Sequence, residues 1–125
     1  EFRLWDKVKF LPSRLKIGDV YQQADLFVIP SLWEGSPNAL AEAMAYGLPA
    51  VGFRVDGVRQ LIEDHRTGWL CSTMNVESLA KTLQVAIESR DDFKKFGRMA
   101  RDVTKTYSED AICQRWVDLI LSLEE

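Results

Sequence analysis

The fold of this chain is decided by residues 25–30, whose sequence is Asp-Leu-Phe-Val-Ile-Pro. A nearly continuous apolar run of this length, stopped by proline, is typical of a strand that is covered on both faces in a parallel sheet. Runs with the same strand-like character recur at residues 8–12, 49–53 and 68–71. Segments of helical composition lie between them, at residues 18–24, 37–46 and 58–62. Strands that alternate with helices predict a parallel sheet with right-handed crossovers.

Beyond residue 75 the periodicity is that of helices alone. Apolar side chains recur at helical spacing in three successive segments, residues 76–87, 93–103 and 112–123. Asn75 is the expected N-cap of the first segment, and the third is entered through Ser108. The predicted fold class is therefore α/β, a Rossmann-like partial parallel sheet of about four strands with helices on both faces and a helical C-terminal tail.

The composition fits one compact domain and excludes several classes of function. The chain has 125 residues, of which 46% are hydrophobic, and a formal net charge of -3. Because its 16 Lys and Arg residues are scattered, we expect no nucleic-acid partner. No apolar run approaches the roughly 20 residues that span a bilayer, so a cytoplasmic protein is expected. Cys71 and Cys113 lack metal-ligand spacing and are predicted to be buried thiols.

The chemistry is expected in the loop that follows the apolar strand, residues 31–38. Ligands of open α/β sheets bind at the carboxyl ends of the strands, where such loops lie. This loop contains the carboxylate of Glu34 and then Gly35, which lets a backbone approach a ligand closely. A helix follows, and its free N-terminal amides favour a diphosphate or sugar hydroxyls. Trp33 is expected to pack against the sheet rather than to stack on a ligand.

Glu42 is a second candidate, because it is a lone carboxylate in the apolar helix after this loop. A carboxylate can accept two hydrogen bonds from vicinal hydroxyls, such as those of a ribose. Glu34 and Glu42 would differ by about 80 degrees on an uninterrupted helix, and need not share a face if Glu34 lies in the loop. The sequence has no Asp-x-Asp motif and no His cluster, so no metal is expected.

The order of these motifs resembles a known family. The chain contains Ala24-Asp25-Leu26-Phe27-Val28-Ile29-Pro30-Ser31, then Glu34-Gly35, Glu42-Ala43, Gly47-Leu48-Pro49, Asp56-Gly57 and Thr67-Gly68. This order resembles the family-four retaining glycosyltransferases, also called the group 1 glycosyl transferase domain, whose signature is two Glu separated by seven residues. The resemblance covers nearly the whole chain. It implies that residues 1–125 are the C-terminal part of a GT-B nucleotide-sugar-binding domain, a fragment of a larger enzyme.

The resemblance also implies a role for each residue of the site. Glu34 would be the catalytic residue beside the donor sugar, and Glu42 would accept hydrogen bonds from the ribose. The donor sugar and phosphate would be bound by Gly35, Ser36, Pro37, Asn38 and Ala39. The nucleotide base would lie near residues 12–14. No cofactor is implied beyond the nucleotide sugar as co-substrate, and the basic side chains that clamp the diphosphate would precede residue 1.

The expected function is transfer of a sugar, of the hexosyltransferase type, from a nucleotide-diphosphate-sugar donor to an acceptor with retention of anomeric configuration. Such a protein would serve polysaccharide or glycolipid biosynthesis. The fragment alone is expected to be inactive, to need the N-terminal remainder of its own chain, and to self-associate through an unpaired sheet edge. That remainder would also allow peripheral attachment to a membrane.

Two other functions stay open, a module that binds a nucleotide sugar without transfer and a GT-B-type sugar epimerase. A phosphorylated receiver domain fits poorly, because it needs acidic residues at the strand ends. Here those strands end in Leu11-Pro12 and Pro30-Ser31.

Overall fold

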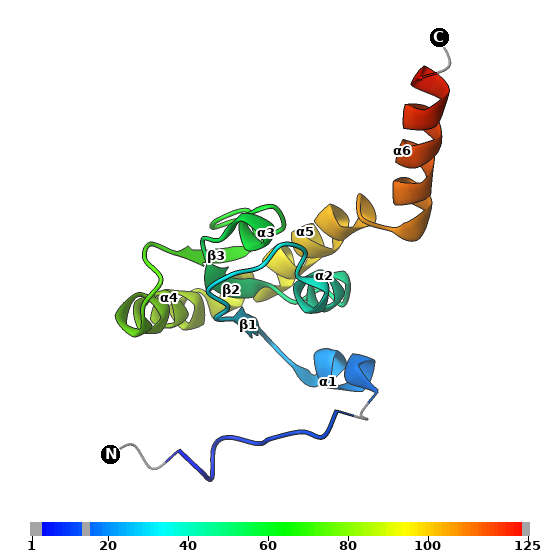
Figure 1. Cartoon of the computed structure of the whole chain (residues 1–125). Helices are drawn as coiled ribbons and strands as arrows, with labels where there is room; N and C mark the ends of the chain where they lie inside the picture. Colours follow the sequence, from blue (N-terminus) through cyan, green and yellow to red (C-terminus); the bar gives the residue numbers. More distant parts are fainter. Residues whose placement is uncertain (1–3, 14–15, 124–125) are drawn as a thin grey trace.

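The computed structural model describes residues 4–13 and 16–123, and within them three strands form one parallel sheet in the order β1-β2-β3 (Figure 1). Strand β1 is Phe27–Ile29, β2 is Ala50–Phe53 and β3 is Gly68–Cys71. Phe27 lies opposite Ala50, which in turn lies opposite Gly68. Because the strands are parallel, their carboxyl ends and the loops that follow lie at one edge of the sheet.

Helices connect and flank the strands. In chain order they are α1 (Ile17–Gln23), α2 (Asn38–Ala45), α3 (Asp56–Arg59), α4 (Val76–Glu88), the 3-10 helix η1 (Arg90–Asp92), α5 (Phe93–Lys105) and α6 (Glu109–Ser122). Helix α2 connects β1 to β2, and α3 connects β2 to β3. The α/β class, the parallel sheet and the helical end of the chain are thus confirmed.

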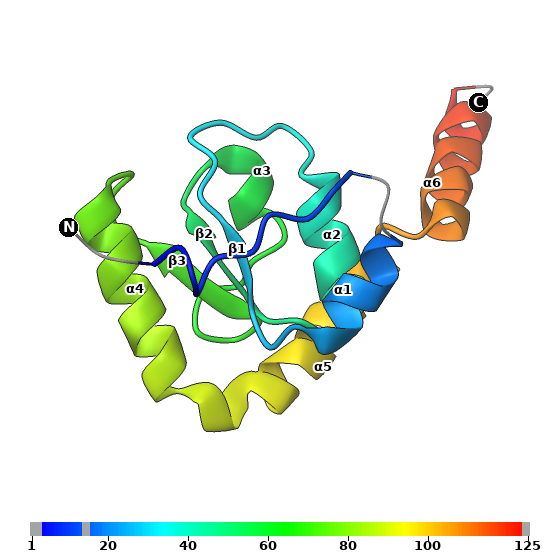
Figure 2. The ribbon, with the colours of Figure 1, turned by 90° about the horizontal axis from the view of Figure 1, so that it is seen from below.

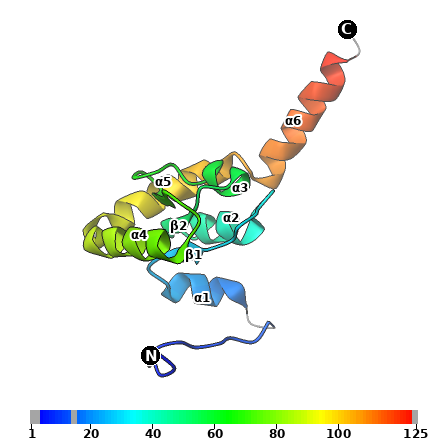
Figure 3. The same cartoon turned by 60° about the vertical axis from the view of Figure 1, so that its left-hand side comes forward.

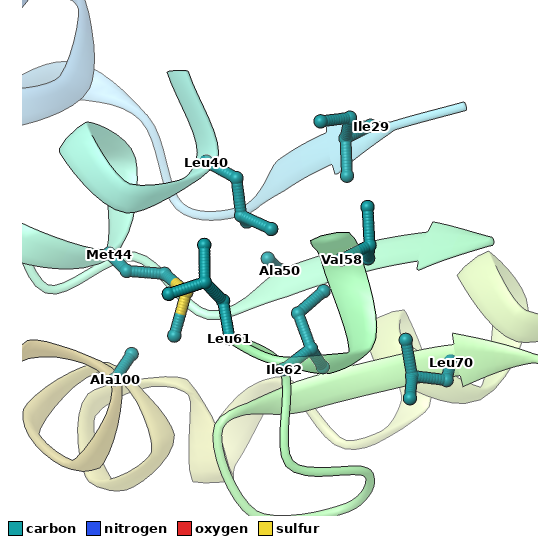
Figure 4. Packing of buried hydrophobic residues seen from close by; sticks show 9 residues of the cluster. All are labelled: Ile29, Leu40, Met44, Ala50, Val58, Leu61, Ile62, Leu70 and Ala100. Atoms are coloured by element: carbon teal, nitrogen blue, oxygen red, sulfur yellow. The ribbon is translucent and has the colours of Figure 1, made fainter. Parts of the chain in front are cut away.

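The helices cover both faces of the sheet, as predicted, and each face has its own core. On one face, Leu40 and Met44 of α2 pack with Val58 of α3 and with α5 (Figure 4). On the other face, Val51 and Trp69 of the strands pack with α4 and α5. Successive side chains of a strand point to opposite faces, so strands covered on both sides are apolar throughout.

Helix α5 passes very close to the end of α2. Gly97 of α5 packs on the carbonyl of Gly47, and a Cβ at Gly97 would overlap that oxygen. Gly47 ends α2 with a φ of 81°, a conformation that favours glycine. The Arg101 guanidinium donates to the carbonyls of Ala45 at 3.1 Å and Tyr46 at 3.2 Å. These contacts fix α2, the helix that follows the candidate loop.

Helix α6 projects away from the sheet and the helices that cover it, which together form the packed unit of the chain (Figure 3). Its N-cap is Ser108, whose hydroxyl oxygen accepts a hydrogen bond from the Ala111 amide at 3.3 Å. None of its residues is buried, and Trp116 is 61% exposed. One cysteine prediction is therefore wrong, because Cys113 on α6 is exposed, whereas Cys71 in β3 is buried. No helix of the described residues is both long enough and apolar enough to cross a bilayer.

The strand predicted at residues 8–12 is a second correction. These residues form no strand, and Phe10 is 81% exposed. A strand-like sequence becomes a strand only where a neighbouring strand supplies hydrogen-bonding partners. The described strands pair with one another and not with this segment, which lies apart from the sheet (Figure 1). The sheet therefore has three described strands rather than about four.

Candidate active site

The loop between β1 and α2 lies at the carboxyl end of the sheet, as the sequence predicts. Helix α2 begins at Asn38, after the buried Pro37, and has no side-chain cap. The amides of Leu40 and Ala41 both donate to the Pro37 carbonyl at 3.1 Å. The amides of Asn38 and Ala39 come earlier in the helix, where no intrahelical acceptor exists. The start of α2 therefore offers N–H donors at the positive end of the helix dipole.

Helix α3 packs against the backbone of this loop. The Gly57 amide donates to the Glu34 carbonyl at 3.0 Å. A Cβ at Gly57 would lie 2.5 Å from the Glu34 carbonyl oxygen and 2.7 Å from that of Gly35. Because such distances leave no room for a side chain, this approach requires glycine. The Asp56-Gly57 pair, read from the sequence as a turn, thus begins α3 and fixes the backbone of the predicted catalytic residue.

A pocket of about 150 Å³ opens beside the start of α2. Four of the predicted donor-binding residues line it, namely Gly35, Ser36, Pro37 and Asn38. The rest of the lining comes from α2, from α3 and the residues after it, and from the junction of α5 with α6: Ala41, Gly57, Gln60, Leu61, Tyr107 and Ile112. Among the described residues, no charged side chain lines this pocket. Its polar groups are hydroxyls and amides, which suit neutral hydroxyl groups or an anion held by backbone N–H groups.

Gln60 and Tyr107 are candidate binding residues that the sequence did not reveal. Gln60 reaches the pocket because Gly57, three residues earlier, packs against the loop. Tyr107 reaches it because α5 packs against α2 and ends nearby. No local sequence motif indicates that Gln60 or Tyr107 lines the pocket, since both contacts arise from tertiary packing. Within the described residues, no group of three or more His, Cys, Asp or Glu side chains could hold a metal ion.

Glu34 is half-buried in the fixed loop and does not line the pocket. Ala39 is exposed and is also absent from the lining. Trp33 is 84% exposed, so the prediction that it packs against the sheet is wrong. Leu32 is exposed as well, because the loop has already left the sheet, whose strand ends at Ile29.

Glu42 is exposed on α2, outside the pocket lining. It lines a separate open hollow of about 440 Å³, together with Arg101, Thr104 and Lys105 of α5. The Tyr21 hydroxyl of α1 donates to the Ala39 carbonyl at 3.4 Å, and burial, followed by the negative charge of Glu42, raises the pKa of Tyr21. The structure thus places Glu34 before the start of α2 and Glu42 in the middle of this helix, and the two do not line one pocket.

The predicted base-binding segment is only partly described. Pro12 and Ser13 are exposed, and Arg14 lies outside the described residues.

Comparison with known proteins gives relatives over most of the chain. A Haemophilus influenzae protein described as an uncharacterized glycosyltransferase is 31% identical over 92% of this chain and 33% of its own length. The amylovoran biosynthesis glycosyltransferase AmsK of Erwinia amylovora is 35% identical over 91% of this chain and 29% of its own length. This chain therefore spans about a third of the length of these relatives.

A solved structure shows the same fold. Anabaena HepE, in complex with UDP and glucose, superposes with a TM-score of 0.79 at 24% sequence identity, over 95% of this chain and 33% of that one. The α/β arrangement is thus that of GT-B glycosyltransferase domains. The glycosyl transferases group 1 family matches residues 1–103. Because this match covers most of the sequence, the chain belongs to the glycosyl transferases group 1 family.

Proposed function

We propose that this chain is the donor-binding part of a glycosyltransferase that takes its sugar from a nucleotide-diphosphate sugar. The observation that carries the proposal is the fixed loop at the carboxyl end of β1, where Glu34, a pocket and the uncapped start of α2 lie together. In this proposal, residues 1–125 are the C-terminal part of a GT-B nucleotide-sugar-binding domain. The acceptor-binding part and the N-terminal remainder belong to the rest of the protein.

The donor would lie across the start of α2. Residues Gly35, Ser36, Pro37, Asn38 and Ala39 would contact its sugar and phosphate groups, with Glu34 beside the sugar. Glu42 would accept hydrogen bonds from the ribose, since its carboxylate is exposed and offers two oxygens. The HepE structure, which contains UDP and glucose, supports a nucleotide sugar as donor.

The reaction would proceed with retention, as a hexosyl transfer. The bond between the anomeric carbon and the diphosphate oxygen breaks, and the acceptor oxygen bonds to that carbon on the same face. The acceptor proton leaves with the diphosphate. The N–H groups at the start of α2 would stabilise the negative charge that grows on the leaving group, because they are already oriented before the reaction. Basic side chains outside residues 1–125 would add to this effect, and no metal would be required.

The pathway would be the assembly of a polysaccharide or glycolipid, as the name of AmsK suggests for that relative. The protein would act in the cytoplasm or at the membrane surface. A module that binds a nucleotide sugar without transfer, or an epimerase, would share the fold. Product analysis separates these functions, because only a transferase joins the labelled sugar to an acceptor.

Kinetics of the full-length protein test the proposal. Glu42→Ala should raise the dissociation constant of the donor about tenfold, because hydrogen bonds to a charged group are lost. Glu34→Ala should lower kcat about a hundredfold, the scale expected when a group that acts on the reacting sugar is removed. Proton NMR of the product should show an anomeric configuration equal to that of the donor.

Two controls complete this test. Glu77→Ala, at an exposed position in the first turn of α4, should change neither constant. The isolated 125-residue chain should transfer no sugar. Unchanged constants in both the Glu34 and the Glu42 variants would contradict the proposed function.

A further inference from the structure

The pocket beside the start of α2 is too small for a whole hexose. Its volume is about 150 Å³. A protein cavity of about this volume takes a molecule the size of benzene, which has about six heavy atoms. A hexose ring with its hydroxyl groups is much larger. The pocket can therefore receive a substituent of a sugar, while the ring itself stays at the mouth.

The bottom of this pocket is apolar. Leu61 is 5% exposed and belongs to the core cluster between α2 and α3, so only its outermost atoms can face the pocket. Pro37 and Gly57 are buried, and Ala41 is half-buried. Ile112, in the first turn of α6, adds an apolar side wall. A methyl group placed on this surface would leave water and gain free energy, whereas a charged oxygen there would lose its hydration.

The rim of the pocket is polar but carries no charge among the described residues. Its exposed side chains are those of Ser36, Asn38, Gln60 and Tyr107. The amides of Asn38 and Gln60 each offer two N–H donors and one carbonyl acceptor. A ligand group that has both a donor and an acceptor can pair with such amides fully. The pocket thus combines an apolar bottom with a neutral hydrogen-bonding rim.

Gln60 has a defined place opposite the loop that precedes α2. The loop between β1 and α2 lies over α3 (Figure 2), where the Gly57 amide donates to the Glu34 carbonyl at 3.0 Å. Gln60 is the C-cap of α3, and its backbone N–H donates to the Val58 carbonyl. Because α3 is fixed against the loop, the Gln60 side chain starts from a fixed backbone beside Gly35 and the other loop residues of the pocket.

We propose that the donor sugar is an N-acetylhexosamine whose acetamido group enters this pocket, and that Gln60 is the residue that selects it. This inference rests on the proposed function, in which residues 35–39 hold the donor sugar. An acetamido group is small enough for the pocket and presents an N–H donor, a carbonyl acceptor and a methyl group. The Gln60 amide can pair with the first two, and the methyl group can cover Leu61 and Ala41. A hydroxyl group at the same carbon would leave this apolar surface uncovered.

The test compares sugars that differ only in this group, on the full-length protein. UDP-N-acetylglucosamine and UDP-glucose are titrated by calorimetry, and so is the corresponding galactose pair. In at least one pair, the wild-type protein should bind the acetamido sugar about tenfold more tightly, because the other sugar lacks both the buried methyl group and the amide hydrogen bonds. Gln60→Ala should reduce this preference about three- to fivefold and leave binding of the hydroxyl sugar unchanged. Ile112→Trp should fill the pocket from its exposed wall and abolish the preference.

Two further variants separate this inference from the proposed function. Gln84→Ala, at an exposed glutamine on α4, is the matched control and should keep the wild-type preference. Glu42→Ala should weaken both sugars of a pair equally, since it removes the proposed ribose contact.

Equal binding of the two sugars in both pairs would overturn the inference and leave the proposed function intact. The full preference in both Gln60→Ala and Ile112→Trp would show that another part of the protein reads the acetamido group. Failure of all four UDP sugars to bind would also overturn the inference. The proposed function, which names no nucleotide, would then be decided by the kinetics of the Glu34 and Glu42 variants with GDP and ADP sugars.

Discussion

Strands β2 and β3 are buried at every residue, whereas helix α6 has no buried residue in the described structure. Both regions nevertheless have regular secondary structure. In the sheet, the apolar side chains pack against helices on two faces. In α6, the N-cap at Ser108 and the helical backbone bonds supply the local order, while Trp116 is 61% exposed. The comparison teaches that an apolar sequence pattern accompanies burial in one region and not in the other.

This difference should appear in the energetics. A helix of 14 residues is marginal on its own in water, and most helical stability in proteins comes from tertiary packing. Changes in the packed unit should therefore lower the global free energy of unfolding. Changes in α6 should alter local opening alone, because few contacts connect this helix to the remainder.

The largest effect is expected where α5 meets α2. Gly97→Ala in the 125-residue chain should lower the free energy of unfolding by about 3 kcal/mol, because its methyl group would overlap the Gly47 carbonyl. Urea denaturation followed by circular dichroism measures this change. Gly35→Ala is the matched control, since no atom lies within 4 Å of the added Cβ. Its effect should stay within about 0.5 kcal/mol, and equal effects at the two glycines would contradict the described packing.

A pair of leucines compares the two regions directly. Leu40→Ala, at a fully buried site in α2, should cost about 3 kcal/mol through lost burial and a new cavity. Leu119→Ala, at a site in α6 that is 51% exposed, should cost less than about 1 kcal/mol. Both are measured by urea denaturation. A cost at Leu119 as large as that at Leu40 would mean that α6 is covered in solution, and the comparison would fail.

The smallest effects are expected at the helix caps. Asn75→Ala should destabilise the protein by about 1 kcal/mol, since the Asn75 side chain accepts from the Ser78 amide at 2.8 Å and α4 packs on the sheet. Ser108→Ala should speed hydrogen exchange within α6 and leave the urea midpoint unchanged. Hydrogen exchange by NMR measures the opening of α6, and urea denaturation measures the midpoint of each variant. A midpoint that moves equally in the two variants would show that α6 unfolds together with the sheet.

Local signals in the sequence were enough for most elements of the fold. The apolar run at residues 68–71 became β3 with those same bounds, and the predicted N-cap Asn75 is confirmed. The strand prediction at residues 8–12 was wrong, because strand formation depends on a neighbouring strand that this run does not specify. The predicted burial of Cys113 was wrong for a related reason. Its position on a periodic helix did not reveal whether another element covers that helix.

The candidate site was likewise predicted only in part. The loop, its glycine and the helix start were predicted in their correct places, because the order of residue types along the chain carries that information. The contribution of Gln60 and Tyr107 to the pocket was not, since it requires that α3 and the end of α5 meet the loop in space. The outward position of Trp33 was missed because an aromatic residue beside an apolar strand suggests burial. The roles assigned to Glu34 and Glu42 remain predictions.

The two cysteines have a practical consequence for spectroscopy. Cys71 is fully buried in β3 and Cys113 is exposed on α6, and the chain has no other cysteine. A maleimide fluorophore should therefore label the native 125-residue chain at one place, without any engineered thiol. The label would lie on α6, the helix in which no described residue is buried. Its anisotropy and quenching would report directly on whether another surface covers α6.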